Sequence, residues 1–309
     1  VDKNMSKAVF LFDYNGKFVN RLSYLGNGPR EYLNINHVFK VTNSIIAIQD
    51  RMKDVVLYFD DKGTFLYQTK GLQYGCDIEC IGCNRIAVDV RSVGGINNPK
   101  TEDYAFVVSD SLYQKVYAVG TDTYSEKLNY GATKRLFRYN DIVYGIPNFE
   151  NYVYQFDSEG VCVKYVLDII SDDVSDFRYS TREELKQLEQ RYPFFKGHFY
   201  EFDNYSCFVI KSASFNAYIL YNHQTKDVYL LDSEYANPLI TFFWNPYMVD
   251  AGNAFVTSSL PATLLSYKEQ FYDGASVEIR KDLDLLYNDM KVDDNPVLFF
   301  YHLKDKIAE

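Results

Sequence analysis

Phe12-Asp13-Tyr14-Asn15-Gly16 is the stretch that decides the fold, because the chain repeats its pattern at Phe59-Asp60-Asp61-Lys62-Gly63 and Phe156-Asp157-Ser158-Glu159-Gly160. Each copy stands between short runs rich in β-forming residues. An aspartate at the start of a turn can accept hydrogen bonds from backbone N–H groups two residues later, and a glycine after a type I turn can take the positive φ that closes a hairpin. The pattern therefore predicts a β-hairpin at each copy.

Three weaker copies extend the series, at Ser109–Tyr113, Tyr221–Thr225 and Tyr301–Asp305. The anchor positions are then 13, 60, 110, 157, 222 and 302, with steps of 47, 50, 47, 65 and 80 residues. A period of about 40–50 residues is typical of propeller blades, and the two longer steps indicate insertions. We therefore expect an all-β fold, a six-bladed β-propeller with two short helical insertions, as a single domain over residues 1–309.

Four strands are expected in each of the second to fifth blades. They are predicted at 37–41, 45–49, 55–59 and 65–69; at 78–81, 86–90, 104–108 and 115–119; at 135–138, 142–146, 152–156 and 161–167; and at 198–202, 207–211, 217–221 and 227–231. The first insertion, residues 180–192, opens with a capping-box sequence ahead of apolar residues at helical spacing. The second, residues 277–290, also carries one apolar stripe.

Composition narrows the classes of partner. The net charge is −10 and the pI is about 5.0, which opposes binding to nucleic acid or to an anionic membrane, since both need a basic face. No apolar run reaches the roughly 18–20 residues that a transmembrane helix needs. We expect a monomer without a transmembrane segment.

The start of the chain carries a separate expectation. Val1 and Asp2 read as the end of a strand that leads into the first hairpin, and the first residue is not methionine. We expect that an upstream piece, with a first strand and a secretion signal, is missing from this sequence.

Five cysteines form an odd set, so at least one is unpaired within the chain: Cys76, Cys80, Cys83, Cys162 and Cys207. Cys80 and Cys83 have CxxC spacing, but they fall in a predicted turn between strands and no second CxxC or histidine pair accompanies them. Small structural residues are the favoured interpretation. A disulfide with Cys76 and a metal site remain alternatives.

The segment Gly26-Asn27-Gly28-Pro29-Arg30-Glu31-Tyr32 resembles the Gly-x-Gly-Pro-x-Glu-Tyr segment of six-bladed, NHL-like β-propeller proteins abundant in Bacteroidetes. The resemblance extends over the chain through the repeated hairpins. It implies an exported protein, in the periplasm or anchored to the outer membrane as a lipoprotein, and most members have no assigned activity. This chain has Arg30 where the family pattern has glycine, and no lipidated cysteine stands near its start.

This segment has two interpretations. The structural one is a crossing between blades, in which Glu31 caps backbone N–H groups and Tyr32 packs between blades. The functional one places Arg30 and Glu31 beside the central channel, within reach of a ligand.

A propeller usually binds its ligand at the mouth of the axial channel, which inner strands line. The candidate ligand-binding residues are Arg30, His37, Glu79, Arg135, Arg138, His198, Tyr200 and Trp244, with Asp77 and Glu201 beside them. Arginine can pair with carboxylates and aromatic rings can stack on apolar faces, which suits a glycan, a peptide or a small anion. Because strand residues alternate in direction, about half of this set must face a neighbouring blade.

Motifs of known catalytic sites are absent from the sequence: there is no Gly-x-Ser-x-Gly elbow, HExxH or P-loop. The favoured function is a non-catalytic exported propeller that binds a glycan, a peptide or a protein partner at the channel mouth or rim. The alternative is a hydrolase or lyase, lactonase-like or glycan-active, whose site is assembled from several blades. No metal or cofactor is expected, an axial calcium ion being the alternative.

Overall fold

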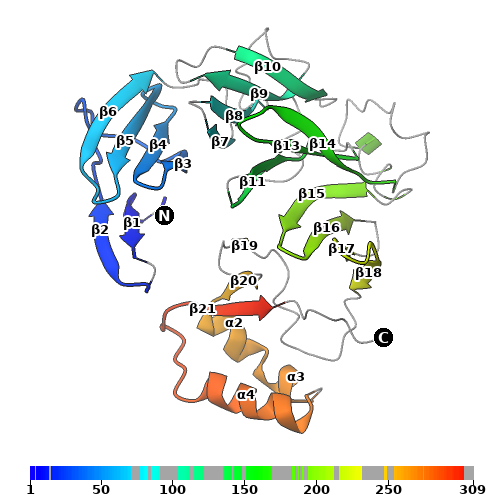
Figure 1. Ribbon diagram of the computed structural model, residues 1–309. Helices are drawn as coiled ribbons and strands as arrows, with labels where there is room; N and C mark the ends of the chain where they lie inside the picture. The colour runs from blue at the N-terminus through cyan, green and yellow to red at the C-terminus, as the bar shows by residue number, and fades with distance from the viewer. Residues whose placement is uncertain are drawn as a thin grey trace. The chain divides into compact units, whose positions relative to one another are not determined.

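The computed structural model describes most of the chain (Figure 1). The described residues are 1–3, 5–13, 15–70, 77–82, 85–90, 104–110, 115–121, 135–140, 142–147, 151–168, 183–184, 187, 190, 194–211, 216–231, 247–248, 254–273 and 275–302. The chain divides into two compact units, Val1–His198 and Phe199–Glu309, and each is treated on its own. The single-domain expectation stays a prediction.

The first unit contains four antiparallel sheets. The first blade is a two-stranded sheet of β1 (Val9–Phe12) and β2 (Phe18–Leu22). The second blade contains β3 (His37–Thr42), β4 (Ile45–Asp50), β5 (Val55–Asp60) and β6 (Phe65–Lys70). The third contains β7 (Asp77–Gly82), β8 (Arg85–Asp89), β9 (Tyr104–Asp110) and β10 (Lys115–Thr121). The fourth contains β11 (Leu136–Tyr139), β12 (Ile142–Gly145), β13 (Tyr152–Phe156) and β14 (Val161–Val166).

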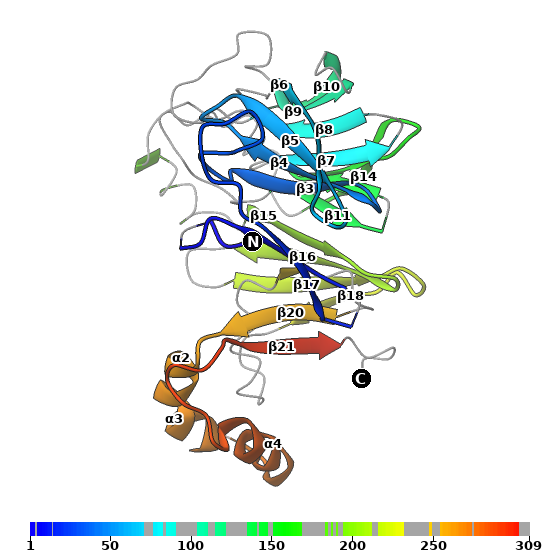
Figure 2. The ribbon, with the colours of Figure 1, turned by 90° about the vertical axis from the view of Figure 1, so that its left-hand side faces the viewer.

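Among its described residues, the second unit holds the remaining sheets and three helices. The fifth blade, which begins at the boundary of the units, contains β15 (Phe194–Glu201), β16 (Tyr205–Lys211), β17 (Asn216–Asn222) and β18 (Val228–Leu231). The sixth contains β19 (Tyr247–Met248), β20 (Ala254–Ser259) and β21 (Val297–His302). Between β20 and β21 the chain forms α2 (Pro261–Ser266), α3 (Lys268–Asp273) and α4 (Val277–Tyr287), which gather at one end of this strand pair (Figure 2).

Six sheets, each antiparallel, confirm the six-bladed β-propeller, and the strands lie within a few residues of the predicted ranges. The predicted helix at 277–290 is α4, whose first turn is capped by Ser276. In the first insertion the described residues Glu183, Glu184, Gln187 and Gln190 are helical. The sequence prediction missed α2 and α3, which are too short to show a full apolar stripe.

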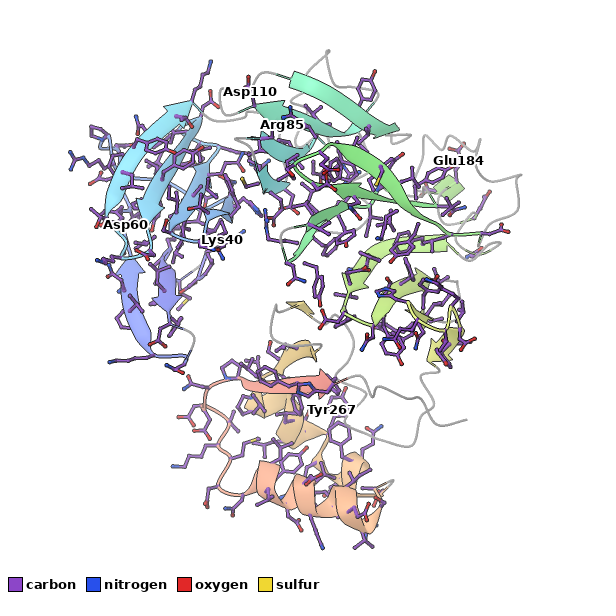
Figure 3. The ribbon with its side chains drawn as sticks, viewed as in Figure 1. Lys40, Asp60, Arg85, Asp110, Glu184 and Tyr267 are labelled. Carbon is purple, nitrogen blue, oxygen red and sulfur yellow. The ribbon has the colours of Figure 1, made fainter. Side chains whose placement is uncertain are left out.

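The aspartates of the repeated hairpins form the predicted hydrogen bonds. Asp13 Oδ1 accepts the N–H groups of Asn15 and Lys17, both at 2.9 Å. Asp60, labelled in Figure 3, likewise accepts the backbone N–H groups of Lys62 and Thr64. Asp157 accepts those of Glu159 and Gly160. In the fifth blade an asparagine, Asn222, takes the same place. One local interaction therefore closes the hairpin in four blades.

Apolar clusters join neighbouring blades of the first unit. The cluster between the first and second blades includes the buried side chains of Val9, Leu22 and Tyr32 on one side and of Leu57 and Phe59 on the other. A second cluster joins the second and third blades through residues such as Phe39 and Ile78, and a third joins the third and fourth through Phe106 and Phe156. Each blade is thus stabilised mainly by the faces of its neighbours.

Strand β21 connects two apolar cores of the second unit. Its side chains alternate between half-buried and exposed. Val297 and Phe299 pack against the helical cluster of Leu264, Phe271, Ala275, Leu283 and Tyr287, whereas Tyr301 packs against the core of the fifth blade. The helical insertion is therefore attached through the strand that follows it.

Replacing Gly63 with alanine should destabilise the protein more than the same change at Gly16. Both glycines have positive φ, 86° and 75°, which costs an alanine about 1–2 kcal/mol. A Cβ on Gly63 would also lie 2.5 Å from Leu22 Cδ2 and 2.7 Å from Asn20 Nδ2, whereas one on Gly16 would meet nothing within 4 Å. Urea unfolding should give a loss of about 2–4 kcal/mol for Gly63→Ala, and equal losses would contradict a tight contact between the first two blades.

Asp60 should contribute to stability only while its carboxyl group is ionised. Hydrogen bonds from Thr64 lower its pKa below the ordinary value of 3.8, with Lys62 contributing. Because the folded-state pKa is lowered, this stabilisation is present above about pH 4 and is lost as the pH falls through the folded-state pKa. Thermal melting from pH 7 to pH 3 should show Asp60→Asn melting below the unmodified protein at pH 7 and converging with it in acid.

Asp61→Asn is the control, since it removes the same charge from the adjacent exposed residue of the turn. The same convergence in Asp61→Asn would show that general charge repulsion, and not the turn, causes the effect.

Candidate functional site

The inner strands of the second, third and fourth blades bring most of the candidate residues together. β7 contacts β3 on one side and β11 on the other. His37 lies on β3, Asp77 and Glu79 on β7, Arg138 on β11, and Arg135 directly before β11. The ionisable side chains of this group contact one another across the boundaries between blades.

Asp77 connects three blades through one carboxylate. Its Oδ1 lies 3.0 Å from His37 Nε2 of the second blade, and its Oδ2 accepts the backbone N–H of Leu136 in the fourth blade at 3.3 Å. His37 Nε2 also lies 2.9 Å from the carbonyl oxygen of Ile78. Both oxygens near Nε2 are acceptors when Asp77 is ionised, so this nitrogen carries the proton.

Arg135 and Asp89 form a fully buried ion pair, with no exposure of either side chain. Arg135 Nε donates to Asp89 Oδ2 at 3.0 Å, and Nη2 donates to Oδ1. Asp89 stands directly opposite Asp77 in the β7–β8 register, so two carboxylates are buried side by side. The guanidinium group offsets the repulsion between them and also lies over the ring of Phe106, 5.4 Å from its centroid.

Arg138 makes a second, more open contact between the third and fourth blades. Its Nε lies 3.3 Å from Glu79 Oε2, and its Nη2 donates to the carbonyl oxygen of Cys80. The Arg138 side chain is 25% exposed and that of Glu79 is 9% exposed. Among these contacts, the Arg138 side chain is therefore the most exposed to solvent.

The Gly26–Tyr32 segment forms the predicted crossing. Glu31 accepts the backbone N–H of Gly28 at 2.7 Å, and Tyr32 is buried between the first two blades. The Tyr32 hydroxyl donates to the carbonyl oxygen of Lys7 at 2.7 Å and also lies 3.1 Å from that of Leu22. Lys53 Nζ donates to the carbonyl oxygens of Gly28 and Glu31, each at 2.7 Å. These contacts support the structural interpretation.

Arg30 is exposed and its guanidinium lies over the ring of Phe65, 5.5 Å from the centroid, at the start of the outer strand β6. No contact of the described residues joins it to the group around Asp77.

The other candidates belong to the fifth blade or lie outside the described residues. Tyr200 is buried in the core of the fifth blade, and burial raises the pKa of its hydroxyl far above the ordinary value. His198 is half-buried on β15. Trp244, Cys76 and Cys83 lie outside the described residues, while Cys80, Cys162 and Cys207 are free thiols.

The sequence analysis missed two arrangements. Asp89 ends an apolar strand, and only its position opposite Asp77 could have indicated a role. In the fifth blade, Ser206 Oγ donates to Glu201 Oε2 at 2.6 Å and lies 2.8 Å from His223 Nε2, while His223 Nδ1 lies 3.1 Å from the carbonyl oxygen of Asp203. Ser206 is fully buried and directs its proton to Glu201, so this cluster holds two turns together and does not present a nucleophile.

Within the described ranges, no three histidine, cysteine, aspartate or glutamate residues are grouped as metal ligands. The same residues contain no helix of the length and apolar character that a membrane span requires.

Comparisons with known proteins give a family and a fold. The sequence profile described as "Domain of unknown function (DUF4934)" matches residues 1–302. A candidate exported protein from Bacteroides fragilis has a crystal structure with a TM-score of 0.73 and 18% identity, and the match covers 97% of this chain and 86% of that one. The crystal structure of a DUF4221 protein from Bacteroides vulgatus has a TM-score of 0.49 and 9% identity, and the match covers 81% of this chain and 80% of that one. No curated protein matches the chain.

Replacing Arg135 with methionine should destabilise the protein by about 3–5 kcal/mol, because Asp89 would remain buried without its counter-ion. Arg138→Met, which removes a partly exposed arginine, should cost about 1–2 kcal/mol. The double variant Arg135→Met/Asp89→Leu should recover most of the loss, since it removes both members of the pair and leaves neither buried without its partner. Urea unfolding measures all three, and an Arg135→Met variant no less stable than Arg138→Met would contradict the buried pair.

Proposed function

This chain belongs to the DUF4934 family, and we propose that it is a non-catalytic, exported β-propeller that binds a glycan, a peptide or a protein partner at the channel mouth or rim. We infer the site from the inner strands of the second to fourth blades. Of the candidate residues, we propose Arg138, His37 and Glu79 as the ligand-binding group of these strands, with the buried Arg135 holding them in place. Arg30, His198, Tyr200 and Trp244 stay individual candidates.

The observation that carries this proposal is the mutual pairing of the ionisable side chains on these strands. A general acid or base must reach the proton that it transfers, and a nucleophile must reach its substrate. His37, Asp77, Asp89 and Arg135 instead contact one another across blade boundaries, largely shielded from solvent. This arrangement favours a structural role for these residues, which form a scaffold that holds the inner strands in position.

Arg138 and His37 give this scaffold its proposed binding chemistry. Their side chains are 25% and 14% exposed, so each presents some polar surface while it keeps its contact with the next blade. An arginine fixed by a neighbouring carboxylate can donate to ligand oxygens with little loss of side-chain entropy. A carboxylate of a peptide or the hydroxyl and acidic groups of a glycan would suit these donors.

Export is supported by two observations of different kinds. The sequence resembles NHL-like propellers that are exported in Bacteroidetes, often as lipoproteins. The Bacteroides fragilis protein that shares this fold is itself a candidate exported protein. We propose a periplasmic or outer-membrane-anchored location on these grounds.

The test is a binding screen of the purified chain against a glycan array and a library of short peptides, with affinities of the hits measured by calorimetry. Arg138→Gln should weaken binding about tenfold, because it removes a charged donor worth about 1.4 kcal/mol or more. Arg280→Gln, on the surface of α4, is the matched control and should bind as the unmodified protein does.

Thermal melting must show that the Arg138→Gln variant is folded before its affinity is compared. Unchanged affinity in that variant would contradict the channel mouth as the binding place. Conversion of a bound ligand to product, followed by mass spectrometry, would contradict the non-catalytic proposal.

A further inference from the structure

The inner strands bury more negative than positive charge where the second, third and fourth blades meet. The side chains of Asp77, Glu79 and Asp89 are 3%, 9% and 0% exposed. Arg135 pairs with Asp89, and both side chains are fully buried. Arg138 pairs with Glu79. Three carboxylates and two guanidinium groups leave one negative charge, and it belongs to Asp77.

His37 supplies the cation that can balance Asp77. Its Nε2 lies 3.0 Å from Asp77 Oδ1 and 2.9 Å from the carbonyl oxygen of Ile78. Two acceptors at Nε2 require a proton on this nitrogen in the neutral and in the charged ring alike. The charge of the imidazole is therefore set by a second proton, at Nδ1, and it can change while both contacts of Nε2 persist.

The strands β3, β4 and β7 carry three further charged residues in the neighbourhood of His37, and none of them competes with Asp77. Asp50 is fully buried and accepts backbone N–H groups of the turn after β4. The residue before it stands opposite His37, so Asp50 lies on the other face of the sheet. Lys40 is exposed and also alternates to the other face. Glu79 is held by its own arginine.

We propose that His37 is a pH-sensitive link between the second and third blades, in which an imidazolium holds the buried carboxylate of Asp77 near neutral pH. A contacting opposite charge favours the charged form of a histidine, whereas burial disfavours it. The contact outweighs burial here, because His37 remains 14% exposed and a neutral ring would leave Asp77 buried without a counter-ion. The inference goes beyond the proposed function, because it holds whether or not a ligand is bound.

The direction of the pH dependence follows from this pairing. His37 should keep its second proton in the folded chain above about pH 6.5, where an ordinary histidine loses it. Because the folded chain then binds this proton more tightly than the unfolded chain, the link stabilises the protein fully below about pH 6.5. The stabilisation is lost as the pH rises through the midpoint of the His37 titration in the folded chain.

The first test follows the imidazole directly, by nuclear magnetic resonance of the full chain labelled at its four histidines, between pH 5 and pH 9. His37→Gln identifies the resonance of His37. Its titration midpoint should lie about one pH unit or more above the ordinary value of about 6.5, which is at least a tenfold higher affinity for the proton. Asp77→Asn, which removes the charge and leaves the Asp89–Arg135 pair, should lower this midpoint by about one unit.

Thermal melting between pH 6 and pH 9 tests the consequence for stability. His37→Gln keeps a neutral N–H donor of similar reach but carries no charge at any pH. It should melt below the unmodified protein at pH 6, and the difference should shrink steadily as the pH rises to 9. His302→Gln, which replaces an exposed histidine at the end of β21, is the matched control. Its difference from the unmodified protein should not change with pH in this way.

Three results would overturn the proposal. A His37 midpoint at or below about 6.5 would mean that the ring is neutral beside Asp77. An unchanged midpoint in Asp77→Asn would mean that the pair does not set the charge. A melting difference of His37→Gln that stays constant from pH 6 to pH 9 would leave His37 a role in packing and hydrogen bonding alone. The titration of the unmodified protein and the melting of His37→Gln decide the outcome even where Asp77→Asn does not fold.

Discussion

The carboxylate of Asp77 is the constraint on which the inner strands of the first unit depend. Its two oxygens contact His37 of the second blade and the backbone of Leu136 in the fourth, so one side chain fixes the spacing of three blades. Asp89 lies opposite it, and Arg135 makes two buried carboxylates tolerable. Apolar clusters supply most of the favourable free energy of packing, whereas this polar group makes one alignment of the strands preferable to its alternatives.

Local chemistry explains why the fold could be predicted. Asp13, Asp60 and Asp157 each accept hydrogen bonds from backbone groups of their own turn. The sequence signal is therefore confined to five adjacent residues, and it recurs at the blade period. The pairing of His37, Asp77 and Arg135 depends on residues about 40–60 positions apart and on which face of each strand they occupy. The sequence could therefore nominate these residues but not show that they contact each other, and Asp89 carried no signal of its own.

The same contrast separates the two interpretations of the Gly26–Tyr32 segment. A Cβ on Gly26 would lie 2.2 Å from the Glu31 carboxylate, so the glycine leaves room for the side chain that caps Gly28. Lys53 then binds the carbonyl groups of this crossing from the second blade. The specific sequence is sufficiently explained by how tightly the chain must turn between the first two blades.

Strand β21 has a consequence for the order of folding. Its partner β20 ends at Ser259, and residues 260–296 must be accommodated before the two strands can pair. Closing a flexible loop of this length carries an entropic cost, but α2, α3 and α4 share a core that brings its ends together. The core that the helices share therefore lowers the entropic cost of pairing β20 with β21, so that the insertion acts as a built-in template for the two strands that flank it.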